Sequence, residues 1–317
     1  MGFIGKRLVI TALTLFLVSV LTFSAFRLIP GDAALLALGI DATEAQIEAL
    51  RSEMGLDRSY PEQYFSWLQG LLSGNLGYST RFRGASVSGM IMERLPVTLT
   101  LAALSFVLII IISVPVSLFA VKKENSLANH IINTVTALNI SIPGFFLSVI
   151  LIWIFGIVFR VFIPGAYVCY TENIPAFLGS LFFPALAIAL PNAALVVKFL
   201  RSSVLRELQS DYVRTAKSKG ISRSGILRRH ILKNASLPAI TLLGMITGEI
   251  LSGSIVIEQV FGIPGMGRLL LASITARDYI MIETIVVYIA FAVILANTLA
   301  DIILQIVDPR IRISQKV

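Results

Sequence analysis

The sequence has 317 residues, of which 56% are hydrophobic and 14% are charged, and its mean hydropathy is +0.86. Soluble domains carry about 25% charged residues, so this composition excludes an ordinary soluble protein and indicates an integral membrane protein. A formal net charge of +8 would by itself suggest a nucleic-acid partner. Cys169 is the single cysteine, and His130 and His230 are the two histidines. These counts exclude an intrachain disulfide and argue against a metal site built by this chain.

Six apolar segments are long enough to cross the hydrocarbon core as helices, which takes about 20 residues. In chain order they are residues 8–26, 97–121, 131–159, 174–197, 235–257 and 284–307. Lys6 and Arg7 precede the first segment, as they would in a signal peptide. Its apolar run is longer than the about 7–15 residues of a signal peptide, however, and no A-x-A cleavage site follows. We therefore expect the first segment to stay in the protein as a membrane helix.

The cations are distributed unevenly between the segments that separate these spans. With the N-terminus in the cytoplasm, 17 of the 26 Lys and Arg residues lie on the cytoplasmic side, ten of them from Lys198 to Lys233. Twelve of the 18 acidic residues then lie outside, counting Glu258 there. Cytoplasmic segments of membrane proteins are enriched in Lys and Arg, so we expect residues 1–7 and 308–317 inside and 27–96 outside. The net charge then reports membrane topology and not nucleic-acid binding.

Residues 27–96 carry two short helical signals. The first begins with the capping-box spacing of Thr43 and Gln46 and stops at Gly55, and the second begins at Pro61 and closes at Gly74. Their apolar faces are formed by Ile47, Leu50 and Met54 in the first and by Tyr64, Phe65, Leu68 and Leu72 in the second. We expect a small helical cap on the outer membrane face. A docking surface for an external partner is the alternative, and both can hold together.

Prolines inside the third and fourth expected spans indicate possible kinks. Pro143 and Gly144 lie within the third span, and Pro184 and Pro191 lie within the fourth. Proline inside a helix removes a backbone hydrogen bond and kinks the helix. Such kinks suit a gate or hinge beside a pathway, but they are also common where helices only pack, so both interpretations stay open.

Two acidic residues lie inside expected spans, Glu249 in the fifth and Asp301 in the sixth. An ionisable side chain at membrane depth marks a functional site or faces a wet cavity. Glu249 is followed by the small residues Ser252 and Gly253, which allow close helix approach. For these three we expect either interhelical packing with a hydrogen bond or a contact with a translocation path. For Asp301, nearer the cytoplasmic end, we expect a structural polar contact.

The basic segment 198–233 has the pattern of two short amphipathic helices around a glycine. Val204, Leu208, Tyr212 and Ala216 form an i, i+4 stripe that Gly220 would end. Ser222 or Ser224 can cap the second helix, in which Leu227 and Ile231 face one way. We expect a projecting cytoplasmic knob. It either lies against anionic lipid, at about 1 kcal/mol per cation near the surface, or docks on a cytoplasmic partner.

Part of this segment carries a resemblance to a known family. Residues 211–216 (DYVRTA), Gly220 and Leu237-Pro238 resemble the EAA-type loop of bacterial ABC importer permeases. With the following RRHILKNASLP, the segment is similar to the dipeptide, oligopeptide and nickel permease family. Further stretches match in family order: RLIPGD (27–32), MGLD (54–57), QY with WL (63–68), RLPVTL (94–99), EQVFGIPGMG (258–267), RDY (277–279) and DPRIR (308–312).

The resemblance implies an all-α integral membrane protein with six transmembrane helices and the type I ABC importer permease fold, in the bacterial cytoplasmic (inner) membrane. Its loop 198–234 would hold the coupling helix, which fits a cleft on an ATP-binding subunit. The residues implied in this role are Asp211, Tyr212, Arg214, Thr215, Ala216, Lys217 and Gly220. Asp211 stands where the family more commonly has Glu, which keeps the charge. In the outer loop, Pro264 and Gly265 are expected to form a tight re-entrant or gate-side turn.

The partners implied are a second homologous permease, two ATP-binding subunits, an extracytoplasmic substrate-binding protein and membrane lipid. No G-x-x-x-x-G-K-[ST] occurs in the sequence, so we expect ATP and magnesium to bind the partner subunits and no cofactor to bind this chain. No nucleophile–base pair near a span suggests a membrane enzyme either. The expected role is half of a translocation pathway that works by alternating access.

The cargo expected is small peptides, with nickel as the alternative because RRHILKNASLPAIT and GMITGEI look somewhat like the nickel branch. Neither histidine lies in a span or outside, so nickel would cross as a chelate or weakly through Glu249. An ion-coupled secondary transporter that uses Glu249 and Asp301 is a remote alternative, although no inverted repeat is visible. A membrane scaffold without transport is the third class.

Overall fold

The computed structural model of the chain describes residues 3–28, 33–38, 42–53, 55–79, 81–82 and 84–307. The expected C-terminal segment 308–317, with its DPRIR stretch, and Met54 of the first outer helix lie outside the described residues. Regular structure in the described part is helical, apart from an isolated bridge between Tyr78 and Ser86.

Five helices of the described residues are long and apolar enough to cross a membrane. They are α1 (Phe3–Arg27), α5 (Val87–Lys122), α8 (Ile174–Glu207), α11 (Leu232–Phe261) and α13 (Tyr279–Val307). α6 (Leu127–Ser141) and the segment of α7 (Gly144–Leu151) with the π-helix η1 (Ile152–Val158) are long and apolar enough only as a pair, which is bent by 109° as in a broken span or a re-entrant loop. Counting this pair as one span gives the six expected.

The third span is therefore not the straight helix 131–159 that its apolar run predicts. Ile142 and Pro143 both have extended backbone, with ψ of 123° and 139°. A residue that precedes proline is disfavoured in the helical region, and α7 starts afresh from Pro143. Pro184 and Pro191, in contrast, lie inside the continuous helix α8, so those prolines do not break their span.

The second span is longer than the apolar run 97–121, because α5 begins at Val87. Ser86 caps it by accepting a hydrogen bond from the Gly89 amide at 3.4 Å. Charged residues end the apolar run but they do not end a helix, so α5 starts before the run.

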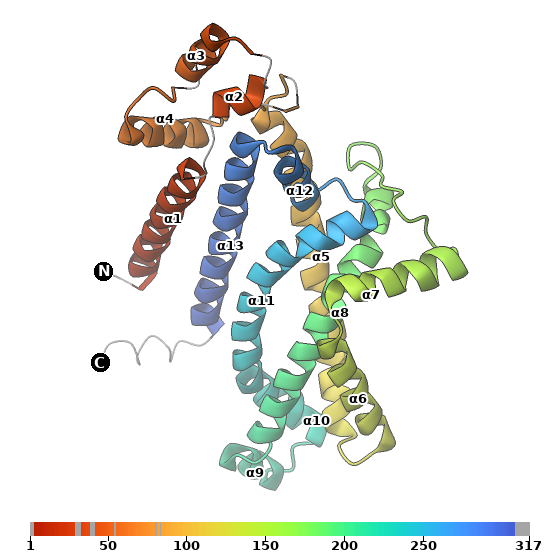
Figure 1. Cartoon of the computed structure of the whole chain (residues 1–317). Coiled ribbons are helices and arrows are strands. Elements are labelled where there is room, and N and C mark those ends of the chain that lie inside the picture. The colour runs from red at the N-terminus through yellow and green to blue at the C-terminus, as the bar shows by residue number, and fades with distance from the viewer. Residues whose placement is uncertain are drawn as a thin grey trace.

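α8 lies at the centre of the bundle, packed against α5 and α11 (Figure 1). The largest group of buried apolar residues joins α5, α7, α8 and α11, with Leu101, Leu181 and Ile250 among its most buried members. A second group lies at the end that carries α9 (Asp211–Ser218), and a third joins α5 and α13 to α12 (Met266–Ala276) at the other end. The bundle therefore has two ends with different additions.

α1 packs along α13, and polar pairs fasten the two helices near both of their ends. Arg7 forms an ion pair with Asp301, and Nη1 of Arg27 lies 3.9 Å from Oε2 of Glu283. Arg27 follows Arg7 by twenty positions, or about 30 Å at 1.5 Å per residue, which is the thickness of the hydrocarbon core. The polar pairs thus mark its two edges, and the structural polar contact expected for Asp301 is confirmed.

The end marked by Arg27 carries three short helices, α2 (Ala33–Leu38), α3 (Glu44–Glu53) and α4 (Tyr60–Ser73), which we call the helical cap. Figure 1 shows α4 lying across the end of α1. The expected capping box is present, since the Thr43 amide donates to Oε1 of Gln46 at 3.0 Å. Gly74 closes α4 with a φ of 75°, as its position predicts.

The cap is attached to α1 through Gln63, Tyr64 and Trp67 of α4, and Nε of Arg27 donates to Oε1 of Gln63 at 3.1 Å. The Tyr64 hydroxyl lies 2.8 Å from Oγ of Ser19. The rings of Tyr64 and Trp67 pack against Phe23, at centroid distances of 5.4 and 5.6 Å. These contacts confirm a helical cap that packs on one end of the bundle.

Candidate functional site

The end of the bundle opposite the helical cap carries the short amphipathic helix α9 (Figure 1). Val213 and Ala216 are its buried residues, while Asp211, Arg214 and Lys217 are exposed. Side-chain exposure of 95% for Asp211 and 76% for Arg214 leaves both free to meet a partner, although they lie 3.4 Å apart. The helix therefore has one face fixed to the protein and one charged face turned outward.

The stripe from Val204 to Ala216 is not one continuous helix face, contrary to the sequence prediction. α8 ends at Glu207, and α9 starts at Asp211 after a turn. The Ser210 hydroxyl donates to the Glu207 carbonyl at 2.6 Å, and the backbone of Ser210 is extended. Serine competes in this way with helical hydrogen bonding, so it separates the span from the knob.

The buried face of α9 packs against α10 and belongs to an apolar cluster that includes the ends of three spans. Val213 and Ala216 belong to a cluster with Val121 of α5, Leu200 and Val204 of α8, and Ala235 and Ala239 of α11. Because interiors are packed like crystals and transmit displacement, a force applied to α9 can pass through this cluster, and through α10, into the ends of the spans.

Tyr212 adds a polar tie between α9 and the end of α8. Its hydroxyl donates to Oε2 of Glu207 at 2.5 Å. Burial, together with this hydrogen bond to a carboxylate, raises the pKa of Tyr212 above its usual value. The hydroxyl therefore stays protonated, as a donor must, throughout the physiological range.

The chain reverses after α9 at Gly220, whose φ is 75°. Ser222, and not Ser224, caps the next helical turn, because its Oγ accepts from the Gly225 amide at 3.3 Å. The second short helix is not a separate element, however. The turns α10 (Arg223–Ile226) and η2 (Leu227–Ile231) run directly into α11, giving one apolar helix from Ser224 to Phe261. Leu227 and Ile231 are buried as expected.

α11 exposes a mixed polar face along its length. Exposed positions recur at helical spacing, namely Thr241, Met245, Glu249, Ser252, Val256 and Gln259, with Gly253 beside them. In the described part of the chain, no hydrogen bond or ion pair holds the Glu249 carboxylate, and a Cβ at Gly253 would meet no atom within 4 Å. The interhelical hydrogen bond left open for Glu249 is thus not formed among the residues that the structure describes.

Close helix packing does occur on the adjacent side of α11, at Gly244 and Gly248. A Cβ at Gly244 would lie 2.8 Å from Cβ of Ala300, and one at Gly248 would lie 3.3 Å from Cγ1 of Val293. Two glycines four residues apart let membrane helices approach closely, and here they admit α13. The side of α11 that bears Glu249 is left uncovered.

This uncovered face differs from a lipid-facing one. The exposed large side chains of α1 are apolar, including Leu13, Leu17 and Leu21. Ionisable groups at membrane depth face protein or water and not lipid. The face of α11 with Glu249, Ser252 and Gly253 therefore suits a wet pathway or a second protein chain.

A buried carboxylate joins three helices where α11 meets α12. Oε1 of Glu258 accepts a hydrogen bond from Oγ1 of Thr98 at 2.6 Å. Its Oε2 accepts from the amides of Gly267 and Arg268 at 2.8 and 3.1 Å. Negative charge is stabilised at a helix N-terminus, where amides are otherwise unpaired. We call this arrangement of Glu258, Thr98 and the start of α12 the Glu258 clasp.

The turn that forms the clasp leaves no room for side chains at two positions. Gly262 ends α11 with a φ of 71°. A Cβ at Gly265 would lie 2.3 Å from Cδ of Glu258, and one at Gly267 would lie 2.4 Å from Cα of Ile255. The tight turn expected around Pro264 and Gly265 is therefore present, held from within by a carboxylate that the sequence placed outside the membrane.

Comparison with known proteins identifies the family. Residues 113–313 match the family model described as the binding-protein-dependent transport system inner membrane component, and residues 1–102 match the N-terminal model of the same systems. The chain belongs to this family. It is therefore a multi-pass membrane permease, and the expected fold class is confirmed.

Three relatives of this permease match it nearly end to end. A protein named as a peptide permease in Brucella ovis is 35% identical over 312 residues, covering 97% of this chain and 98% of the relative. A protein named as a peptide ABC transporter permease in Sinorhizobium fredii is 33% identical, covering 98% and 99%. The oligopeptide transport system permease protein AppB of Bacillus subtilis is also 33% identical, covering 98% and 99%.

Among the site residues predicted for the permease, six fall together on α9, with Gly220 just beyond it. Glu249, Ser252 and Gly253 share the uncovered face of α11. The residues considered for a gate or hinge fall at two places, Pro143 and Gly144 at the 109° bend and Pro264 and Gly265 in the turn before α12. No cluster of three or more potential metal ligands lies within the described residues.

Sequence reasoning missed the partnership of Thr98 and Glu258, although both lie in stretches that carry the family resemblance. The two residues are 160 positions apart, so no local pattern joins them. The available signal was an acidic residue near the end of an apolar span, followed closely by glycines. Such a sequence allows a tight turn that brings the start of the next helix over the carboxylate.

Proposed function

We propose that the chain is one of two permease subunits of an ATP-driven importer of small peptides in the bacterial cytoplasmic membrane. The observation that carries this proposal is the position of α9. One face of this helix is exposed and basic, and the other face belongs to an apolar cluster with the ends of three spans. The peptide cargo is supported by the names of the three relatives.

The α9 end lies in the cytoplasm in this proposal, and the helical cap lies outside. Ten cations between Lys198 and Lys233 surround α9, as the enrichment of Lys and Arg in cytoplasmic segments demands. The first residues of α1 then also lie inside, since α1 enters from the α9 side and ends at the cap.

α9 acts as the coupling helix. Asp211, Arg214, Thr215 and Lys217 meet a cleft on an ATP-binding subunit, while Val213 and Ala216 carry the movement into the spans. Two such subunits bind ATP and magnesium and perform hydrolysis, and this chain binds no cofactor. A rigid, packed connection is what allows a change at one site to shift a discrete arrangement elsewhere.

The pathway lies between the uncovered face of α11 and the corresponding face of a second, homologous permease. Glu249 offers a carboxylate to the α-ammonium group of a peptide, and Ser252 and Gly253 leave space beside it. The turn at Pro264 and Gly265, with α12 behind it, gates the outer end. The bend at Pro143 and Gly144 is the second hinge, so that access alternates between the two sides.

The helical cap receives an extracytoplasmic substrate-binding protein. A recess of about 570 Å³ lies between the cap and the start of α13, and its lining includes Arg58, Trp67 and Asn75. Polar and aromatic side chains of this kind are common at protein interfaces. Packing on α1 and docking a partner are thus compatible roles for the cap.

Reconstitution of the intact importer in liposomes, with its cognate binding protein, tests the proposal. Stimulation of ATP hydrolysis by a mixed pool of di- and oligopeptides is the expected result. Stimulation by nickel with free histidine as chelator, and not by peptides, would overturn the cargo and favour the nickel branch. Peptide uptake without ATP would overturn the importer itself and favour an ion-coupled carrier.

A further inference from the structure

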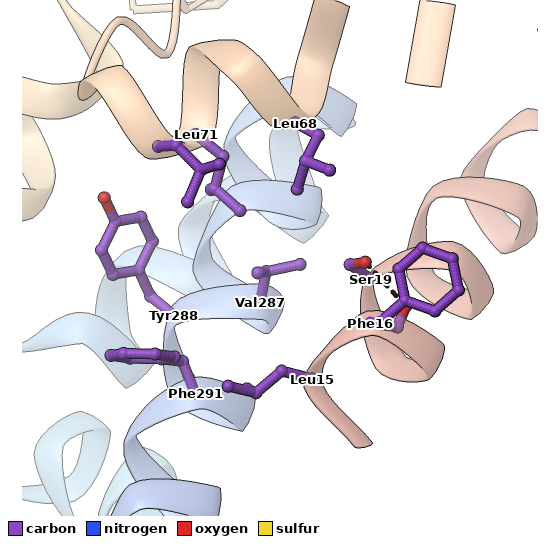
Figure 2. A pocket seen from close by; sticks show the side chains of 9 residues that line it. Leu15, Phe16, Ser19, Leu68, Leu71, Val287, Tyr288 and Phe291 are labelled. Carbon is purple, nitrogen blue, oxygen red and sulfur yellow. Dashed lines mark hydrogen bonds between the residues drawn. The ribbon is translucent and has the colours of Figure 1, made fainter. Parts of the chain in front are cut away.

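A crevice of about 430 Å³ separates α1 from α13 beneath α4. Figure 2 shows Leu68 and Leu71 of α4 above it, Val287 and Phe291 of α13 on one side, and Leu15 of α1 reaching toward Phe291 below. Three helices therefore form its walls and roof, and the side chains that face it are almost all apolar.

The register of the two long helices places the crevice within the hydrocarbon core. Glu283, paired with Arg27, marks the edge of the core on the cap side. Val287 and Phe291 follow it by four and eight residues, which puts them about 6 and 12 Å deeper along α13. Leu15 lies twelve residues before Arg27, or about 18 Å deeper along α1. The crevice thus extends from the cap side of the core to about its middle.

Two hydroxyls, those of Ser19 and Tyr288, are the polar side-chain groups of the lining, and the Ser19 hydroxyl is satisfied by its neighbours. Oγ of Ser19 lies 2.8 Å from the Tyr64 hydroxyl and donates to the Phe16 carbonyl at 2.7 Å. No ionisable Asp, Glu, Lys or Arg side chain lines the crevice. Apolar cavities do not hold water, and apart from the Tyr288 hydroxyl the lining offers water or a polar ligand no side-chain partner.

The size and chemistry of the crevice distinguish among apolar occupants. A helix of a partner subunit is about 10–12 Å in diameter and too wide for a space of about 430 Å³. A peptide would bring a series of backbone amides and carbonyls, most of which find no partner beside the Tyr288 hydroxyl, at a high cost in an apolar site. A single unbranched hydrocarbon chain has neither problem.

The crevice is also continuous with the surface that faces lipid. Of the residues that line it, Phe16 is 51% exposed and Leu72 is 82% exposed. A chain can therefore enter sideways from the bilayer without crossing a polar layer. We propose that the crevice between α1, α4 and α13 binds one acyl chain of a phospholipid from the leaflet on the cap side.

Such a chain completes the packing of α4. Tyr64 and Trp67 fasten one side of α4 to α1, whereas Leu68 and Leu71 face the crevice. The acyl chain packs against these leucines from the membrane side, so lipid contributes to stabilising the position of the helical cap. This inference depends on the membrane position of the chain and not on its cargo.

Native mass spectrometry of the intact importer, during stepwise removal of lipid by detergent, tests the proposal. The wild type is expected to retain one phospholipid per complex after bulk lipid is lost. Leu71→Trp and Val287→Phe fill the crevice and should each lower that retained fraction by at least about fivefold. Leu17→Trp is the matched control, because Leu17 lies on α1 with 50% exposure, outside the lining, and should retain it.

Equal retention by the filled variants and the wild type, with the complex intact, would overturn the proposal. So would a retained mass that matches a peptide or no retained mass at all. If a filled variant fails to assemble, a second measurement on the wild type tests the site. It uses a phospholipid that carries a photoreactive diazirine in the middle of its acyl chain. Crosslinks on Leu68, Leu71 or Val287 that persist after delipidation support the site, and their absence contradicts it.

Discussion

The contact between Gly265 and Glu258 gives the most direct test of the Glu258 clasp. A Cβ at residue 265 would lie 2.3 Å from Cδ of Glu258 and 2.4 Å from each carboxylate oxygen. Non-bonded heavy atoms rest about 3.5–4.0 Å apart, so in Gly265→Ala the carboxylate has to move by about 1 Å or more. The φ of Gly265 is −95°, which any residue adopts. The effect therefore comes from the contact and not from backbone strain.

A shift of that size breaks the bonds from the amides of Gly267 and Arg268 to Oε2, now 2.8 and 3.1 Å long. A hydrogen bond to a charged group contributes about 1.5–3 kcal/mol, so G265A should lower the free energy of unfolding by about 3–6 kcal/mol. The loss of stability is measured by thermal unfolding of the detergent-solubilised importer, with size-exclusion chromatography as the readout of the folded fraction. Gly179→Ala is the matched control, because a Cβ there meets no atom within 4 Å, and its midpoint should stay or rise.

A double-mutant cycle separates the clash from a general intolerance of alanine at this turn. In the Glu258→Ala background the carboxylate is gone, so G265A should add less than about 0.5 kcal/mol to the loss. Additive losses in the double variant would refute the reasoning. A G265A midpoint equal to that of G179A would refute it as well.

Three further predictions concern exposed and paired charges. Reversing both Arg214 and Lys217 to Glu should reduce co-purification of the ATP-binding subunits at least about tenfold without changing thermal unfolding, since both side chains are exposed; normal co-purification would contradict the coupling role. Glu249→Gln should also leave unfolding unchanged, but raise the half-saturating peptide concentration for uptake about 5-fold, or about 1 kcal/mol; an unchanged uptake curve would remove Glu249 from the pathway. In a cycle of Arg7→Ala and Asp301→Ala, unfolding should show a coupling energy of about 0.5–3 kcal/mol, and strictly additive losses would mean that this ion pair contributes nothing.

Features set by neighbouring residues could be predicted from the sequence. The spans follow from runs of apolar residues, and the starts and ends of α3 and α4 follow from Thr43, Gln46 and Gly74, which act within one helical turn. A polar contact could be expected for Asp301 because a charge at membrane depth needs a partner. Its partner Arg7 could not be named, since it lies almost a whole chain length away.

Features that depend on competition between local and distant forces were harder to predict. The run 131–159 is apolar throughout, and only the backbone preference before Pro143 decides that the helix bends. The stripe from Val204 to Ala216 has perfect helical spacing, but one hydroxyl at Ser210 ends the helix within it. The location of α9 was correct, whereas its separation from α8 had to come from the structure.

The continuity of α11 has a mechanical consequence. One helix extends from Ser224 to Phe261. It includes Ala235, which shares the apolar cluster of α9, the uncovered carboxylate of Glu249 and, near its C-terminal end, Glu258 at the start of α12. It is continuous but not straight, and Figure 1 shows it changing direction along its length. If this helix bends or rotates about its axis, all three sites move together. A structural change at one of them therefore cannot remain local.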